Sequence, residues 1–207
     1  MTLTPTSLAL LLGISVALSA VAGPQSFDFK DPKGVNNAAF RLDAPLESVS
    51  GTANGVSGTI TFDAENPAAL HGRIVIAAAS LHVPNPMMKE HLHGEQWVDS
   101  KKHPEITFES TKVSNMKTAG AETTADVTGK FTLRGATKEI TVPVKITYLK
   151  DKLGARSSGQ TQGDLLVVRS KFTIKRSEYG INPGAPSDKV ADEIELTLSL
   201  AGAAPKS

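Results

Sequence analysis

The amino-acid sequence predicts an all-β fold, a single eight-stranded antiparallel barrel that carries one short helix. Eight segments alternate apolar and polar residues with a period of two, which is typical of strands buried on one face. Turn-forming Gly, Asn and Pro residues separate these segments. The chain has 207 residues, of which 40% are hydrophobic, and this suits one domain with one core. Closure of the sheet removes exposed strand edges, although a sandwich of two sheets explains the alternation equally well.

The N-terminus has the features of a secretory signal peptide. Leu8 to Ala20 is an uninterrupted run of apolar, Gly and Ser residues, and it is followed by the A-x-A pattern of Ala20 to Ala22. We therefore expect a signal peptide over residues 1–22 and a mature domain over 23–207, located in the periplasm or secreted. Residues 2–7 contain no Lys or Arg, so an uncleaved membrane anchor is the alternative. No later stretch is apolar enough for a stable membrane span.

The first four expected strands lie in the N-terminal half of the chain. They cover residues 37–43, 57–63, 72–81 and 106–110. The Asn54-Gly55 pair before the second of these suits a tight hairpin turn, because both residue types tolerate positive φ. Their inward side chains are expected to be Ile60, Phe62, Ile74, Ile76, Ile106 and Phe108.

One segment, residues 84–97, has the signals of a helix. Asn85 can cap the helix, Pro86 suits its first turn, and Gly94 is expected to end it. Met88 and Leu92 are four residues apart and would share one face. With the adaptable thioether of Met87, they could form a deformable lid over the barrel.

The last four expected strands cover residues 129–135, 138–149, 170–176 and 193–200, and the segment 201–207 is expected to be a frayed tail. The alternation is clearest in the second of them, where every other residue from Ile140 to Tyr148 is apolar. The expected inward side chains are Phe131, Leu133, Val142, Val144, Phe172, Ile174, Leu196 and Leu198.

Composition excludes several classes of function. A formal net charge of +1 leaves no excess of basic residues for nucleic acid. The absence of cysteine excludes disulfides, thiolate nucleophiles and iron–sulfur clusters. No nucleophile elbow and no phosphate-binding glycine loop is found, so we expect a protein without catalytic residues.

Three histidines, His91, His93 and His103, lie close together in the sequence and could suggest a metal site. On a helix, however, residues two apart point in very different directions, so His91 and His93 would not chelate one ion. No H-E-x-x-H motif accompanies them. We therefore expect structural histidines and no metal.

Three motifs give the chain a resemblance to the YceI family. "HLHGEQWVDSKKHPEITFES" (91–110) resembles the family signature of a His-Leu in a short helix followed by an aromatic-Asp step and I-T-F-x-S. "VTGKFTLRGATKEITVPV" (127–144) resembles its central hairpin, and "FTIKRSEYGI" (172–181) its penultimate strand. The early part fits less well, because Asn36-Asn37 and Ala44-Pro45 stand where family members often carry histidines.

The resemblance implies a lipocalin-like barrel that binds an isoprenoid-like lipid in an elongated central cavity, and that uses no other cofactor. Small side chains at Ala77, Ala78 and Ala79 and an aromatic content of 5% favour an open interior. The side chains expected to contact the lipid are Ile76, Ala78, Met87, Met88, Leu92, Trp97, Phe108, Phe131, Val142, Val144, Phe172, Ile174, Tyr179 and Leu196. Candidates for the mouth of the cavity are His91, Arg176, Tyr179 and Asn182.

Two other functions stay open at this point. One is a metal-associated or heme-associated accessory protein, or an enzyme, that acts on isoprenoid quinones. The other is a structural or interaction module whose barrel is filled by its own side chains, since the same apolar residues can line a cavity or fill it. A homodimer is compatible with the sequence.

Overall fold

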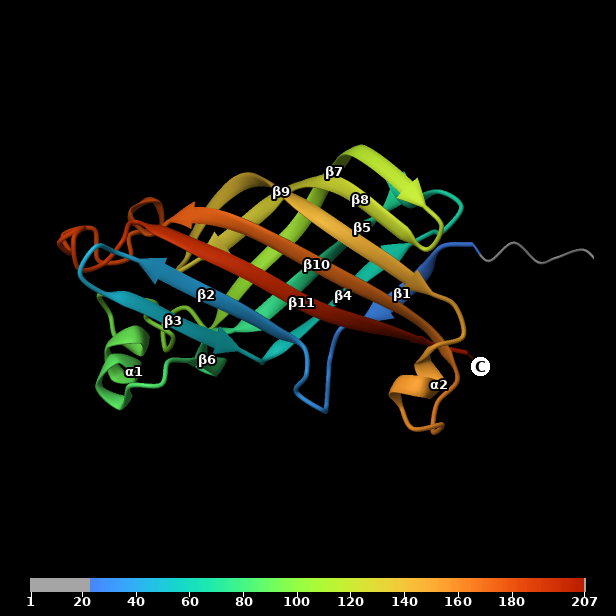
Figure 1. Ribbon diagram of the computed structural model, residues 1–207, viewed down its shortest axis with the longest axis horizontal. Helices are drawn as coiled ribbons and strands as arrows, with labels where there is room; N and C mark the ends of the chain where they lie inside the picture. The colour runs from blue at the N-terminus through green and yellow to red at the C-terminus, as the bar shows by residue number, and fades with distance from the viewer. Residues whose placement is uncertain (1–22, 207) are drawn as a thin grey trace, which may run out of the picture.

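The structure is a computed structural model that describes residues 23–206, so the expected signal peptide lies outside the described residues. Almost all of this part is built from strands (Figure 1). The strands are β1 (Gln25–Asp28), β2 (Asn37–Asp43), β3 (Ser48–Ala53), β4 (Val56–Phe62), β5 (His71–Ala77), β6 (Leu81–His82), β7 (Glu105–Ala119), β8 (Glu122–Leu133), β9 (Ala136–Leu149), β10 (Gly163–Lys175) and β11 (Glu193–Pro205). The helices are α1 (Pro86–His93) and α2 (Leu153–Arg156), with short 3-10 segments at Pro67–Ala69, Ala78–Ser80 and Arg176–Tyr179.

The strands close into an eight-stranded antiparallel barrel. The ring follows the order β1, β4, β5, β7, β8, β9, β10, β11, and it closes where Asp28 of β1 lies opposite Ala203 of β11. Towards the other end of the barrel, β2, β3 and β6 continue the positions of β1, β4 and β5, because β2 pairs with β11, β3 with β2, and β6 with β3. The predicted barrel is therefore confirmed, and each of the eight expected strands falls on a different position of the ring.

The hydrogen bonding between strands is interrupted at this second end, where β6 does not pair with β7. β6 pairs with β3 at only two positions, and β7 pairs with β5 alone on that side of the sheet. Helix α1 lies beside this break, next to β3 and β6 (Figure 1). Leu92 of α1 packs against a buried cluster of Ala53, Ala78, Leu81 and Val98. Helix α1 thus completes the wall where the strands do not.

The Asn54-Gly55 prediction was wrong. β3 and β4 do not pair with each other. β3 pairs antiparallel with β2 and β4 with β1, and β1 and β2 run in the same direction along β11. Asn54 and Gly55 therefore connect two successive strands that run the same way around the barrel, and do not form a hairpin turn. Neither residue has a positive φ. Gly55 is needed for space, since an added Cβ would come within 2.8 Å of the Ser80 side chain.

The expected interior role of the alanine run was also wrong. Strand β5 ends at Ala77, and Ala78 to Ser80 form a 3-10 turn. Ala78 is fully buried in the cluster beneath α1, whereas Ala77 and Ala79 are exposed. Small side chains here allow the turn to pack closely rather than widening the barrel.

Two predictions about strand length and one about a loop were wrong. The expected tail belongs to β11, which pairs with β10 as far as Pro205. Its small residues fit against an aromatic ring, since a Cβ added at Gly202 would come within 2.6 Å of Phe29. Helix α2 lies in a segment expected to be a loop, and β7 continues to Ala119 through two register shifts.

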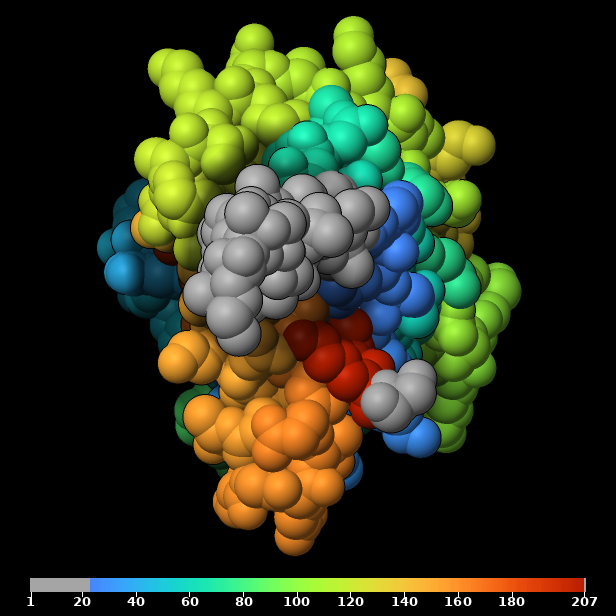
Figure 2. Space-filling view, turned by 90° about the vertical axis from the view of Figure 1, so that its right-hand side faces the viewer, coloured from blue at the N-terminus to red at the C-terminus, as the bar shows by residue number. Residues whose placement is uncertain are grey.

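One end of the barrel is closed by aromatic side chains. Phe27 and Phe29 are fully buried, and Tyr148 packs against Phe27 and Phe62 with ring centroids 6.3 and 6.1 Å apart. Figure 2 looks onto this end, where the C-terminal part of β11 lies between β1 and the region of α2. Buried aromatic rings thus fill the interior of the barrel at this end.

Candidate functional site

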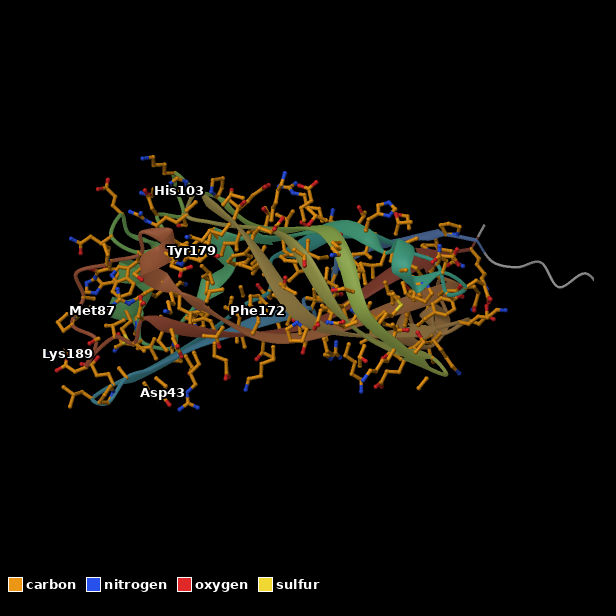
Figure 3. The ribbon with its side chains drawn as sticks, turned by 90° about the horizontal axis from the view of Figure 1, so that it is seen from above. Asp43, Met87, His103, Phe172, Tyr179 and Lys189 are labelled. Atoms are coloured by element: carbon orange, nitrogen blue, oxygen red, sulfur yellow. The ribbon has the colours of Figure 1, made fainter. Side chains whose placement is uncertain are left out.

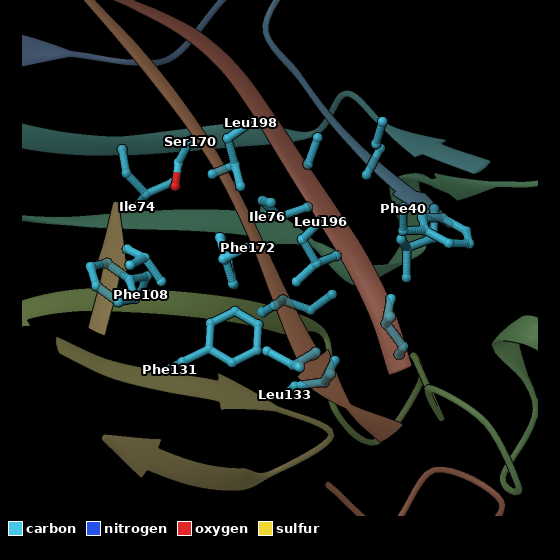
Figure 4. A pocket seen from close by; sticks show the side chains of 18 of the residues that line it. Phe40, Ile74, Ile76, Phe108, Phe131, Leu133, Ser170, Phe172, Leu196 and Leu198 are labelled. Carbon is cyan, nitrogen blue, oxygen red and sulfur yellow. The ribbon is translucent and has the colours of Figure 1, made fainter. Parts of the chain in front are cut away.

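The interior of the barrel is a cavity of about 380 Å³. Most of its wall consists of the inward side chains of the alternating strands (Figure 4), and α1 and the loops near it supply the rest. Leu196 on β11 lies opposite Phe172 on β10 and opposite Phe40 on β2, and Phe108 on β7 lies opposite Phe131 on β8. These neighbouring strands give the middle of the cavity a continuous apolar wall.

Eleven of the fourteen side chains predicted to contact the lipid line this cavity. They are Ile76, Met88, Leu92, Trp97, Phe108, Phe131, Val142, Val144, Phe172, Ile174 and Leu196. Of the other expected inward positions, Ile60, Ile74, Ile106, Leu133 and Leu198 also line it, whereas Phe62 packs into the closed end. Contact of these residues with a ligand stays a prediction.

The other three lie elsewhere. Ala78 is buried beneath α1, and Met87 is 68% exposed to solvent. Tyr179 is buried behind the cavity wall, where its ring packs edge-on against Phe131 with centroids 5.6 Å apart. Burial raises the pKa of the Tyr179 hydroxyl. Tyr179 therefore supports the wall from outside the cavity.

Arg176 is buried and cannot serve at the mouth as predicted. Its guanidinium donates to the carbonyl oxygens of Ile181 and Ala185 at 3.1 Å, of Ala191 at 3.0 Å, and of Val190 at 3.2 Å. It also donates to the carbonyl of Asn182. The planar fork of donors thus holds the loop 180–192 in shape, and no local sequence pattern reveals such a role.

Asn182 is likewise part of that loop. Its backbone N–H donates to the carbonyl of Gln96 at 2.8 Å, which ties the loop to the segment after α1. Of the four predicted mouth residues, only His91 lines the cavity.

Sequence reasoning missed part of the wall and the base of the cavity. β2 and β3 contribute Ala38, Leu42 and Val49, and the deep end is lined by Ile146, Val168 and Leu200. The three deep residues belong to the same buried cluster as Phe27 and Phe29. The alternation of β9 and β11 was a usable signal for Ile146 and Leu200.

Polar side chains inside the cavity are few, and both lining serines are hydrogen-bonded to the backbone. The Ser110 hydroxyl accepts from the Gly72 N–H at 2.9 Å, and the Ser170 hydroxyl donates to the Pro143 carbonyl at 2.7 Å. The titratable lining residues are Glu47 and His91, and both are exposed, so they stand where the cavity meets solvent. The interior can therefore accept a hydrocarbon chain without leaving buried charges unpaired.

The histidines take separate structural positions. His93 lies between the Leu81 carbonyl at 3.0 Å and the Ser100 hydroxyl at 3.1 Å, and His103 packs against the Gly135 turn. In the part of the chain that the structure describes, no group of three or more His, Asp or Glu side chains could hold a metal ion. Within residues 23–206, no helix is long and apolar enough to cross a bilayer.

Curated relatives match most of the chain. A UPF0312 protein of Pseudomonas aeruginosa is 31% identical over 195 residues, which cover 92% of this chain and 94% of the relative. A UPF0312 protein of Yersinia pestis is 31% identical over 198 residues, covering 93% and 95% of the two chains.

Solved structures share the fold. Burkholderia cenocepacia BcnA superposes with a TM-score of 0.64 at 24% identity, covering 80% of this chain and 95% of BcnA. A polyisoprenoid binding domain from Saccharophagus degradans, implicated in plant cell wall breakdown, has a TM-score of 0.64 at 12% identity, covering 87% and 99%. The model of the YceI-like domain matches residues 31–201. From this match and its relatives, the chain belongs to the YceI-like domain family.

Proposed function

We propose that this protein binds the apolar chain of an isoprenoid-like lipid in the barrel and carries or stores it without chemical change. One observation supports this above all: the cavity is lined by hydrocarbon side chains, and its titratable residues stand only where it meets solvent. The base is closed by Phe27, Phe29 and Tyr148, so the chain of the lipid would enter from the other end.

The energetics favour a chain of several isoprene units. Burial of each five-carbon unit contributes about 4 kcal/mol, at about 0.8 kcal/mol per carbon. Association costs about 4–15 kcal/mol, so a few units offset it. Apolar contacts discriminate poorly between chain lengths, and we infer that the closed base sets the length that fits.

The family and a neighbour support a binding protein over an enzyme. The Saccharophagus degradans domain of the same fold is named for polyisoprenoid binding. The cavity lining pairs no nucleophile with a base, and its serines are held by backbone groups. With the N-terminal signal pattern, we propose an exported binding protein, active in the periplasm or outside the cell.

A variant that fills the cavity tests this proposal. Ser170→Phe adds a ring to the inner wall between Phe172 and Val168, and the exposed Pro143 carbonyl that it frees can bind water. We expect the variant to stay folded and to bind geranylgeraniol at least about tenfold more weakly, as followed by Trp97 fluorescence.

The matched control is Lys171→Phe, which adds the same ring at an exposed neighbour on the outer face. This control should bind geranylgeraniol like the unmodified protein. Equal affinity of Ser170→Phe and Lys171→Phe, or no fluorescence response of the unmodified protein, would overturn the proposed function.

A further inference from the structure

Large apolar side chains gather on the surface around the mouth of the cavity. Among the described residues, four large hydrophobic side chains are prominently exposed: Val35 (60%), Leu46 (65%), Met87 (68%) and Met88 (38%). Val35 lies in the loop between β1 and β2, away from the cavity lining. The other three belong to the turn after β2 and to the start of α1.

Three segments form this mouth rim, which we define as residues 44–47, the first turns of α1, and residues 182–192. Each segment contributes a lining residue to the cavity: Glu47, Met88 and Val190. The Leu46 N–H donates to the Asp188 carbonyl at 2.9 Å, so the first and third segments are joined. Figure 3 shows Met87 and Lys189 at the same end of the molecule.

Met88 makes the interior and the surface continuous. It lines the cavity and is also 38% exposed, so apolar surface runs from the wall of the cavity onto the rim. Large exposed apolar residues at one place on a protein mark an interaction surface. The continuity with the cavity indicates a partner from which the apolar ligand itself can come.

The charges of the mouth rim indicate which kind of lipid surface it would bind. On α1, Lys89 stands next to Glu90, and on the loop Asp188 stands next to Lys189, so these charges cancel in pairs. Glu47 and Asp192 add two further carboxylates. A rim without excess positive charge gains nothing from anionic lipids, and apolar insertion remains as the driving force.

We propose that the mouth rim docks onto a zwitterionic lipid bilayer, with Leu46 and Met87 inserted below the headgroups, so that the cavity opens directly to the hydrocarbon. This inference rests on the proposed function and adds the place where the ligand is loaded. A lipid chain that passes from bilayer to barrel by this route avoids exposure to water.

Flotation with phosphatidylcholine vesicles tests the docking. The unmodified protein should float with the vesicles to a similar extent at low and high salt, because apolar insertion is not screened. The double variant Leu46→Lys, Met87→Lys should bind the vesicles at least about tenfold more weakly. Val35→Lys, which removes an equally exposed apolar side chain far from the mouth, should behave like the unmodified protein.

A vesicle-free titration with farnesol separates this inference from the proposed function. Leu46 and Met87 do not line the cavity, so the double variant should bind farnesol with unchanged affinity. Farnesol binding without vesicle binding by the unmodified protein would refute the docking and leave the proposed function standing. Absence of both would refute the proposed function.

Sedimentation of the same proteins tests whether a second copy of the chain, in place of a bilayer, binds to the rim. An unmodified dimer that the double variant converts to a monomer, without vesicle binding, would make the rim a contact between two copies and overturn the bilayer proposal. Vesicle binding that appears only when phosphatidylglycerol is added to the phosphatidylcholine, or that high salt abolishes, would also contradict the bilayer proposal.

Discussion

Asp164 is the most deeply buried charge at the closed end of the barrel, with 1% of its surface exposed. Burial raises the pKa of its carboxyl, but hydrogen bonds from the Asp151 N–H at 2.8 Å and the Tyr148 hydroxyl at 2.7 Å outweigh this and lower the pKa to about 2. Lys206, near the end of β11, lies 3.3 Å from the same carboxylate. Burial raises the pKa of the Tyr148 hydroxyl to about 12, and its hydrogen bond to Asp164 is the second cause. The network thus holds β9, β10 and β11 together at the base.

This network predicts an acid-dependent loss of stability. A carboxyl whose pKa is lowered by folding contributes its full share to the free energy of unfolding at pH values above its unfolded pKa. This contribution is lost as the pH falls towards the folded pKa. For Asp164 the span from 3.8 to about 2 corresponds to about 2 kcal/mol. Urea unfolding should show that the stability difference between the unmodified protein and Asp164→Asn shrinks by this amount from about pH 6 to pH 2. Parallel pH curves would exclude the role assigned to Asp164.

The contacts of Arg176 lead to a second prediction, about the stability of a single-residue variant. It donates to five backbone carbonyls of the loop that borders the mouth, and a Lys ammonium cannot reproduce this fork of donors. Arg176→Lys should therefore lower the free energy of unfolding by about 2–4 kcal/mol, as measured in urea. A matched control is Lys175→Arg on the exposed neighbour, which should change stability little. Equal stability of Arg176→Lys and the unmodified protein would refute this role.

At the scale of elements, α1 is the part of the wall least supported by backbone pairing. Its N-terminus is capped by the Asn85 side chain, which accepts from the N–H groups of Met87 and Met88 at 3.0 and 3.2 Å. The helix covers the break between β6 and β7, and its residues Met88, His91 and Leu92 line the cavity. An opening of α1 would widen the mouth without breaking any strand pair.

Loss of the cap should therefore loosen the mouth. Asn85→Ala should destabilise α1 by about 1 kcal/mol, raise amide exchange in residues 86–93, and speed release of a bound isoprenoid. Asn66→Ala is a matched control, because Asn66 also precedes a proline but its side chain makes no cap bond. Hydrogen exchange with mass spectrometry measures both variants. Unchanged exchange in α1 on loss of the cap would contradict the account of this helix.

The elements that the sequence predicted well are those with a strong local pattern. The capped helix and the clean alternation of β9 were correctly placed. The first half of β10 was missed because its residues are almost all buried, so the run Leu165 to Val168 shows no alternation. The second half of β7 was missed because its register shifts interrupt the period of two and Asn115 has a positive φ.

For the whole molecule, alternation predicted a ring with an apolar interior, and eleven expected ligand contacts line the cavity. Which end is closed could not be predicted, because it depends on packing between residues far apart in the chain. Phe29 against Gly202 and Tyr148 against Phe62 are such contacts. The position of Arg176 likewise depends on carbonyls from a folded loop.

Native mass spectrometry of the protein, isolated from its own host without detergent, shows whether one lipid chain occupies the barrel. We expect an intact mass that exceeds the mature chain by the mass of one isoprenoid-type lipid, which organic extraction then releases. A preparation with only the bare mass of the chain, which stays bare after incubation with geranylgeraniol, would refute lipid binding in the barrel.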